Sequence, residues 1–150
     1  MKKYAVFVTF FMLLVLSWAS AQSNDVLDRI LAEDPLTYGS AAYLLVTAAG
    51  KAPEGSTPEQ AVSLAEQEGF GFENMGVRDG LSTGQYSYML MRAFQVPGGI
   101  WYRILPGPRY AAREMAYMGI IQGPSIPGMA LSGNEALRML ERLMNRSGAS

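Results

Sequence analysis

The side chains best suited to binding chemistry stand together in the segment Gly98–Arg103 of the 150-residue sequence, which contains Trp101 and Tyr102. An aromatic pair beside a guanidinium group can stack on a sugar ring or hold an anionic group. Four arginines belong to this segment or flank it: Arg92, Arg103, Arg109 and Arg113. If they converge in the fold, they form a positive patch and a binding site with the two aromatic residues. The competing interpretation is that Trp101 and Tyr102 cover the core and that the arginines are separate surface residues.

The chain lacks two residue types that carry much enzyme chemistry, because it contains neither Cys nor His. Their absence excludes Cys/His zinc sites, thiol nucleophiles, disulfide frameworks and His-based catalytic triads. The carboxylate pairs Glu54/Glu59 and Glu66/Glu68 have the residue type needed for glycoside hydrolysis, but they stand in polar stretches typical of a solvated surface. The sequence therefore predicts no enzyme, and a small hydrolase of wall polymers is a disfavoured alternative.

Three further patterns predict no metal, cofactor or nucleic acid. The pairs Met89/Met91 and Met115/Met118 have thioethers that suit copper(I), but methionine at helical spacing is more often core filler. The glycine-rich stretch Gly69–Gly76 follows a predicted helix instead of a strand, so it lacks the context of a nucleotide-binding loop. The formal net charge is −1, whereas binding to nucleic acid normally needs a basic face.

The first 21 residues have the pattern of a secretory signal peptide. Lys2 and Lys3 precede the apolar run Ala5–Leu16, and the small residues Ala19 and Ala21 stand where signal peptidase needs them. We expect cleavage after Ala21, one domain over residues 22–150 with a net charge of −3 once both lysines are removed, and a place in the periplasm or at the cell surface. The open alternative is an uncleaved membrane anchor, although the run is short for a span of about 20 residues.

The elements that must position the aromatic and arginine residues are helices, and three helix starts repeat along the chain. The three segments begin at Leu36, Leu81 and Leu131, 45 and 50 residues apart. Each leucine precedes a Ser or Thr that can cap the helix, and Gln85 and Glu135 can complete a capping box. The leucines can pack on the first turn as hydrophobic staples. Amphipathic runs follow, and for the last of them we expect an inward face that includes Leu140 and Met144.

Further helices are expected between these three. One starts around Thr57 with a proline in its first turn and stops at Gly69, and another covers Arg109–Met118. A short helix over residues 26–31 precedes them all. The connections are rich in Gly and Pro, which is typical of ordered turns. The expected order is therefore a capped helix alternating with a second helix, in about two and a half two-helix units.

This pattern resembles the S-layer homology (SLH) repeat of bacterial envelope proteins, over roughly Leu36 to Asn145. That family alternates a helix opening with a Thr-Arg-Ala-Glu motif and a helix ending in a Gly-Ile-hydrophobic-x-Gly turn. The stretch Gly119–Gly123 matches that turn, and Tyr110-Ala111 is similar to the Trp-Ala that opens the same helix. The resemblance implies an all-α helical repeat module with Gly/Pro-rich connecting loops.

The chain departs from the family at one functional position. The family's motif arginine helps to hold an anionic cell-wall polysaccharide, and this chain has Tyr38, Thr83 and Gly133 where the resemblance places that arginine. The cap survives at all three helix starts, but the charged donor is lost from each.

Together these observations predict a non-catalytic exported module of the cell envelope. The favoured hypothesis is that it binds a protein partner as an accessory subunit of an envelope or surface assembly. The alternative is a module that binds a cell-wall or surface glycan through a site rebuilt around Trp101, Tyr102 and the four arginines. We expect no membrane span after signal cleavage.

Overall fold

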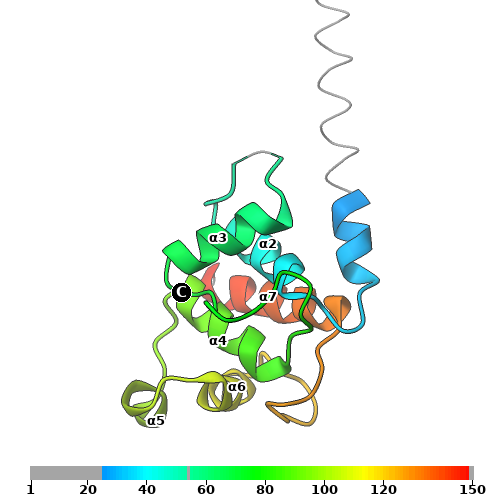
Figure 1. The fold of residues 1–150 in the computed structure, drawn as a ribbon. Helices are drawn as coiled ribbons and strands as arrows, with labels where there is room; N and C mark the ends of the chain where they lie inside the picture. The colour runs from blue at the N-terminus through cyan, green and yellow to red at the C-terminus, as the bar shows by residue number, and fades with distance from the viewer. Residues whose placement is uncertain (1–24, 54, 149–150) are drawn as a thin grey trace, which may run out of the picture.

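All regular elements are helices in the computed structural model, which describes residues 25–53 and 55–148 (Figure 1). The predicted signal peptide, residues 1–21, lies outside them. A short helix covers residues 25–31, and the others are α2 (Tyr38–Ala48), α3 (Pro58–Gln67), α4 (Thr83–Ala93), α5 (Ile100–Ile104), α6 (Pro108–Tyr117) and α7 (Gly133–Gly148). The all-α class is confirmed for these residues. None of these helices is both long and apolar enough to cross a membrane.

The predicted helix starts are present, with different degrees of capping. At α4, Ser82 Oγ accepts from the Gln85 N–H at 3.3 Å and Gln85 Oε1 accepts from the Ser82 N–H at 2.9 Å, so the capping box is confirmed. At α7, Ser132 Oγ accepts from the Glu135 N–H at 3.3 Å. The Glu135 carboxylate lies 3.5 Å from the Arg142 guanidinium, so it pairs with a residue further along α7 instead of completing the predicted capping box.

The start of α2 is capped by a carboxylate that the sequence pattern does not reveal. Glu33, four residues before the cap residue Thr37, accepts from the Thr37 N–H at 2.8 Å and from the Thr37 hydroxyl at 3.0 Å. Its other oxygen accepts from the Ser40 hydroxyl at 2.6 Å. Glu33, which precedes the helix, thus accepts the hydrogen bond from the cap residue's N–H that an acidic residue in the first turn accepts in a capping box. Ser40 donates to Glu33.

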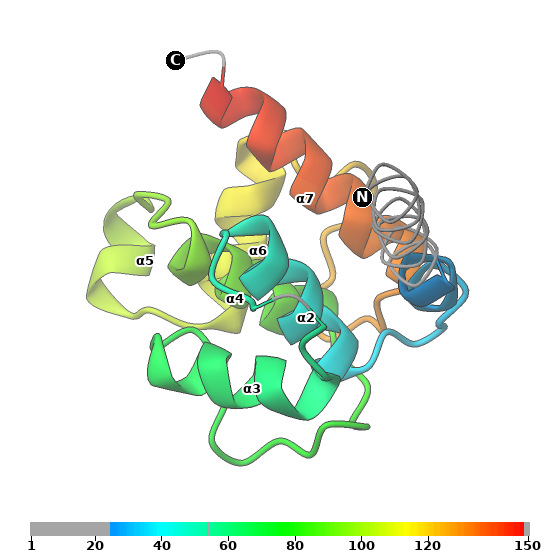
Figure 2. The same cartoon turned by 90° about the horizontal axis from the view of Figure 1, so that it is seen from above.

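The central helix α2 is buried on several sides. It packs against α3, α4 and α7, and its buried residues include Ala41, Ala42, Leu45 and Val46 (Figure 2). On α7 the expected face is partly wrong, because Met139 is buried while Met144 is 44% exposed. Figure 2 shows the last turns of α7 at the edge of the molecule. One side of these turns still contacts the protein, because Leu143 is buried and Arg146 donates to the Met118 carbonyl at 3.2 Å, and Met144 is not on that side.

A ring of three backbone hydrogen bonds joins the residues just before the starts of α2, α4 and α7. The Leu36 N–H donates to the Leu131 carbonyl at 2.6 Å, the Leu81 N–H to the Leu36 carbonyl at 2.8 Å, and the Leu131 N–H to the Leu81 carbonyl at 3.1 Å. All three leucine side chains are buried. The ring satisfies buried backbone groups that no helix or sheet ladder would pair. It therefore fixes the three helix starts around one point.

Glycines allow a second helix to approach the start of each of these helices. A Cβ atom at Gly39 would lie 3.0 Å from the Cβ of Pro58, the first residue of α3, and one at Gly84 would lie 3.0 Å from the carbonyl oxygen of Pro108, the first residue of α6. At Gly133 a Cβ atom would overlap the backbone of the helix over residues 25–31. The helices therefore pack closely where only a glycine fits.

Candidate functional site

The segment that contains Trp101 and Tyr102 forms an additional helix, α5, between α4 and α6 (Figure 1). The sequence pattern predicts no helix over residues 100–104, because a helix of five residues carries too little periodicity to be recognised. Two glycines let α5 lie against its neighbours. A Cβ atom at Gly98 would overlap the Tyr102 ring, and one at Gly99 would lie 2.7 Å from the Glu114 carboxylate on α6.

Tyr102 is the residue of α5 that faces the core. It is 8% exposed, and its ring centroid lies 6.5 Å from that of Tyr88 on α4. Burial raises the pKa of the Tyr102 phenol, the Tyr88 phenol raises it further, and the Arg92 guanidinium lowers it. Its hydroxyl has no hydrogen-bond partner among the described residues. Tyr102 therefore anchors α5 by packing.

The other apolar side chains of α5 and the residue after it point to solvent. Ile100 is 70% exposed, Trp101 59%, Ile104 64% and Leu105 54%. The interpretation that both aromatic residues cover the core is thus right for Tyr102 and wrong for Trp101. The reason is helical geometry, because neighbouring residues on a helix point about 100° apart and only one side of α5 contacts the protein. We call Ile100, Trp101, Ile104 and Leu105 the α5 patch.

The four arginines do not share one role. Arg92 donates to the Gly69 carbonyl through Nε at 3.1 Å and Nη2 at 2.9 Å, so it joins α4 to the end of α3. Arg103 on α5 and Arg109 and Arg113 on α6 are exposed. Arg92 is thus bound to backbone, and the other three are the cations available on the surface of α5 and α6.

A hollow behind α5 has a volume of about 380 Å³ and lies between the ends of α3 and α4. It is lined in part by Arg92, Gln95 and Tyr102. The guanidinium of Arg92 already bonds to Gly69, and Tyr102 supports α5. The two aromatic residues thus face different surroundings. Tyr102 faces the core and this hollow, whereas Trp101 faces the solvent. They therefore do not form a paired platform for one sugar ring.

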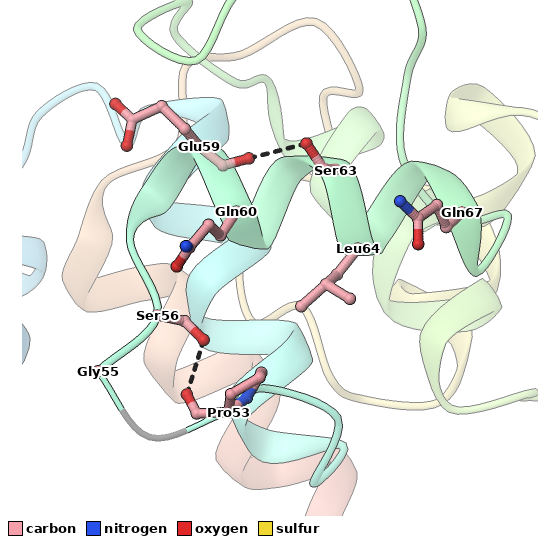
Figure 3. A pocket seen from close by; sticks show the side chains of 8 residues that line it. All are labelled: Pro53, Gly55, Ser56, Glu59, Gln60, Ser63, Leu64 and Gln67. Carbon is pink, nitrogen blue, oxygen red and sulfur yellow. Dashed lines mark hydrogen bonds between the residues drawn. The ribbon is translucent and has the colours of Figure 1, made fainter.

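A larger hollow of about 600 Å³ runs along α3 (Figure 3). Its polar side chains are used locally, since Ser56 donates to the Pro53 carbonyl at 2.6 Å and Ser63 to the Glu59 carbonyl at 3.1 Å. The Glu59 carboxylate is exposed and points away from Gln60 and Ser56 (Figure 3). Its pKa is lowered by a hydrogen bond from its own backbone N–H and by one from Thr57. Such a carboxyl group does not have the raised pKa of a general acid.

The described residues contain no group of three or more acidic side chains placed to hold a metal ion. The sequence matches no protein-family model, and neither a curated protein nor a solved structure matches the chain. The described residues thus form an all-α protein in which four large exposed apolar side chains gather at the α5 patch.

Proposed function

We propose that this chain is a non-catalytic, exported module of the cell envelope that docks on a protein partner through the α5 patch. The observation that carries the proposal is the exposure of four large apolar side chains, three on the short additional helix α5 and one on the residue that follows it. Apolar groups gathered at one place on a surface mark interaction sites far more often than single exposed ones do. A docking role as an accessory subunit accounts for them.

The energetics of the α5 patch favour a protein interface. Complete burial of one such side chain contributes about 1.5–3 kcal/mol, and these side chains are 54–70% exposed, so covering each of them contributes roughly 1–2 kcal/mol. A Trp at the centre of apolar neighbours with an Arg beside it is the usual composition of an interface hot spot. Trp101 and Arg103 provide both.

We also propose that the architecture derives from degenerate SLH-like repeats. The ring of Leu36, Leu81 and Leu131 places the three repeated helix starts in equivalent positions, which supports this origin. In this view the helix over residues 25–31 pairs with α7 at Gly133, as α3 pairs with α2 and α6 with α4. The chain would then have three helix pairs in place of two and a half.

The alternative of a glycan-binding module receives less support. The three positions that the resemblance assigns to the motif arginine are buried, namely Tyr38, Thr83 and Gly133. Together with the separation of Trp101 from Tyr102, this leaves neither the family's charged donor nor a paired aromatic platform. Co-sedimentation of the protein with purified cell-wall material, compared with the variant Arg103→Ala/Arg109→Ala, tests this alternative, which requires binding that the variant loses.

A site-specific crosslink tests the protein partner. A photoreactive benzoylphenylalanine replaces Ile104 in the full chain, expressed in cells that export it, and the matched control places it at Thr47, an exposed residue of α2. Irradiation should give an adduct with one other protein from position 104 and not from position 47. Only monomer, or only an adduct with a second copy of the chain, would overturn the proposal.

A further inference from the structure

Exposed apolar residues concentrate on one part of the molecule. The described residues include eight large hydrophobic side chains that are exposed, and seven of them stand between positions 100 and 129. Beyond the α5 patch these are Tyr117, Ile126 and Met129. They come from the end of α6 and from the loop that follows it. Figure 1 shows α5, α6 and this loop along the same edge of the molecule.

The outer side of α6 continues this surface. Ala111, Ala112 and Met115 are buried on the side of α6 that packs against α4. Arg109, Arg113 and Tyr117 are all exposed and spaced four residues apart, so they form a stripe along the opposite side.

The loop after α6 is held against α4 and α6 by two contacts. Ser125 Oγ donates to the Ala112 carbonyl at 3.4 Å, and the Gly84 N–H donates to the Pro127 carbonyl at 2.8 Å. Gly84 also lies against Pro108, where α6 begins. The α5 patch, the stripe on α6 and the loop 124–129 lie along one edge of the molecule (Figure 1), and we call the three together the α5–α6 face.

The charge of this region is opposite to that of the chain before it. Residues 95–130 contain three arginines and one acidic residue, Glu114, for a net charge of +2. Residues 22–94 contain ten acidic and four basic residues, for a net charge of −6. Glu114 is half-buried beside Gly99. The α5–α6 face therefore has an excess of arginine charge. An acidic partner is drawn to this face and repelled by the acidic residues of the segment 22–94.

The residue types on the face favour a protein over a lipid surface. Trp, Tyr, Met and Arg are enriched in protein interfaces, whereas Lys is depleted, and residues 95–130 contain no Lys. Arginine matches carboxylates with two parallel hydrogen bonds. Attraction to anionic lipid typically uses clusters of four to eight basic residues, more than the three found here.

We infer that the partner is a protein whose docking surface is apolar at its centre and bordered by Asp and Glu side chains, and that it contacts α6 and the loop 124–129 as well as α5. This inference rests on the proposed function and specifies the chemistry of the partner. Arg109 and Arg113 would pair with the acidic border, while Trp101 and its neighbours fill the centre. The same charges would orient the partner before contact.

In the experiment, benzoylphenylalanine replaces Tyr117 in the full chain. Three versions are compared: one with the native arginines, one with Arg109→Lys/Arg113→Lys and one with Arg109→Glu/Arg113→Glu. The expected result is an adduct with the same protein that position 104 captures, with Asp or Glu beside the crosslinked site in the partner. The Glu pair should lower the yield at least about tenfold and the Lys pair much less, as expected for steering by charge. Melting followed by circular dichroism checks that both variants fold.

The outcomes separate this inference from the proposed function. Capture at position 104 without capture at position 117, or a yield that the Glu pair leaves unchanged, overturns the inference and leaves the proposed function standing. No protein adduct at either position overturns both. Binding of the purified protein to phosphatidylglycerol vesicles, with lipid adducts at position 117, assigns the face to a membrane and overturns both.

Discussion

Replacing Glu33 by Ala should destabilise the fold more than any ordinary surface substitution. The carboxylate accepts three hydrogen bonds, from the Thr37 N–H at 2.8 Å, the Thr37 hydroxyl at 3.0 Å and the Ser40 hydroxyl at 2.6 Å. Hydrogen bonds to charged groups contribute about 1.5–3 kcal/mol each when they are well buried. Glu33 is half-buried and Ser40 is buried, so we expect a total loss of about 2–3 kcal/mol after water has replaced part of the network.

The assay is urea unfolding followed by far-ultraviolet circular dichroism, because the loss is a change in the free energy of unfolding. Glu141→Ala serves as the matched control, since Glu141 is exposed on α7 and should change stability by less than about 0.5 kcal/mol. A double-mutant cycle with Ser40→Ala should show coupling of about 1 kcal/mol between Ser40 and Glu33, because the two side chains share a hydrogen bond. The reasoning is refuted if Glu33→Ala unfolds at the same urea concentration as Glu141→Ala.

Two further predictions concern the core. Burial raises the pKa of the Tyr86 phenol far above its usual value, so the folded state holds the phenol proton more tightly than the unfolded state does. The free energy of unfolding should therefore fall as the pH rises above about 10. Tyr86→Phe should weaken that pH dependence and cost about 1 kcal/mol at neutral pH, because the hydroxyl donates to the Ala136 carbonyl at 3.1 Å; equal alkaline slopes for both proteins would contradict this. Gly133→Ala should destabilise by more than about 2 kcal/mol because its Cβ overlaps the Ile30 carbonyl, whereas Gly128→Ala meets open space and should be nearly neutral in thermal melts. Similar melting temperatures for these two variants would show that the helix over residues 25–31 is not held against α7.

The helix starts were predictable because their causes are local. The capping box of Ser82 and Gln85 joins residues three positions apart, and α3 ends at Gly69, a single residue that adopts φ +78°. Glu33 escaped prediction because its contacts to Thr37 and Ser40 depend on how the chain turns between two helices. A sequence pattern records spacing within a helix and does not record such a turn.

The candidate site shows the same division between local and tertiary causes. The sequence singled out Trp101 and Tyr102, and the fold decided that one supports α5 while the other faces solvent. Whether an arginine is available likewise depends on the packing of α3 beside α4, which gives Arg92 the Gly69 carbonyl as its partner. The pattern of α7 predicted an inward Met144, but the side of α7 that packs on the protein includes Met139 and Leu143 and excludes Met144. Spacing alone does not decide which edge of an amphipathic face is covered.

The central claim is that the α5 patch docks on a protein, and the ratio of photocrosslinked adduct from position 104 to that from position 47 tests it most directly. Both positions are exposed, and they lie on α5 and α2 respectively, so the ratio reports the location of contact. We predict one protein adduct with a yield at least about tenfold higher from position 104, as expected when contact energy concentrates at a hot spot. Equal yields from the two positions, or no protein adduct from position 104, would contradict the account.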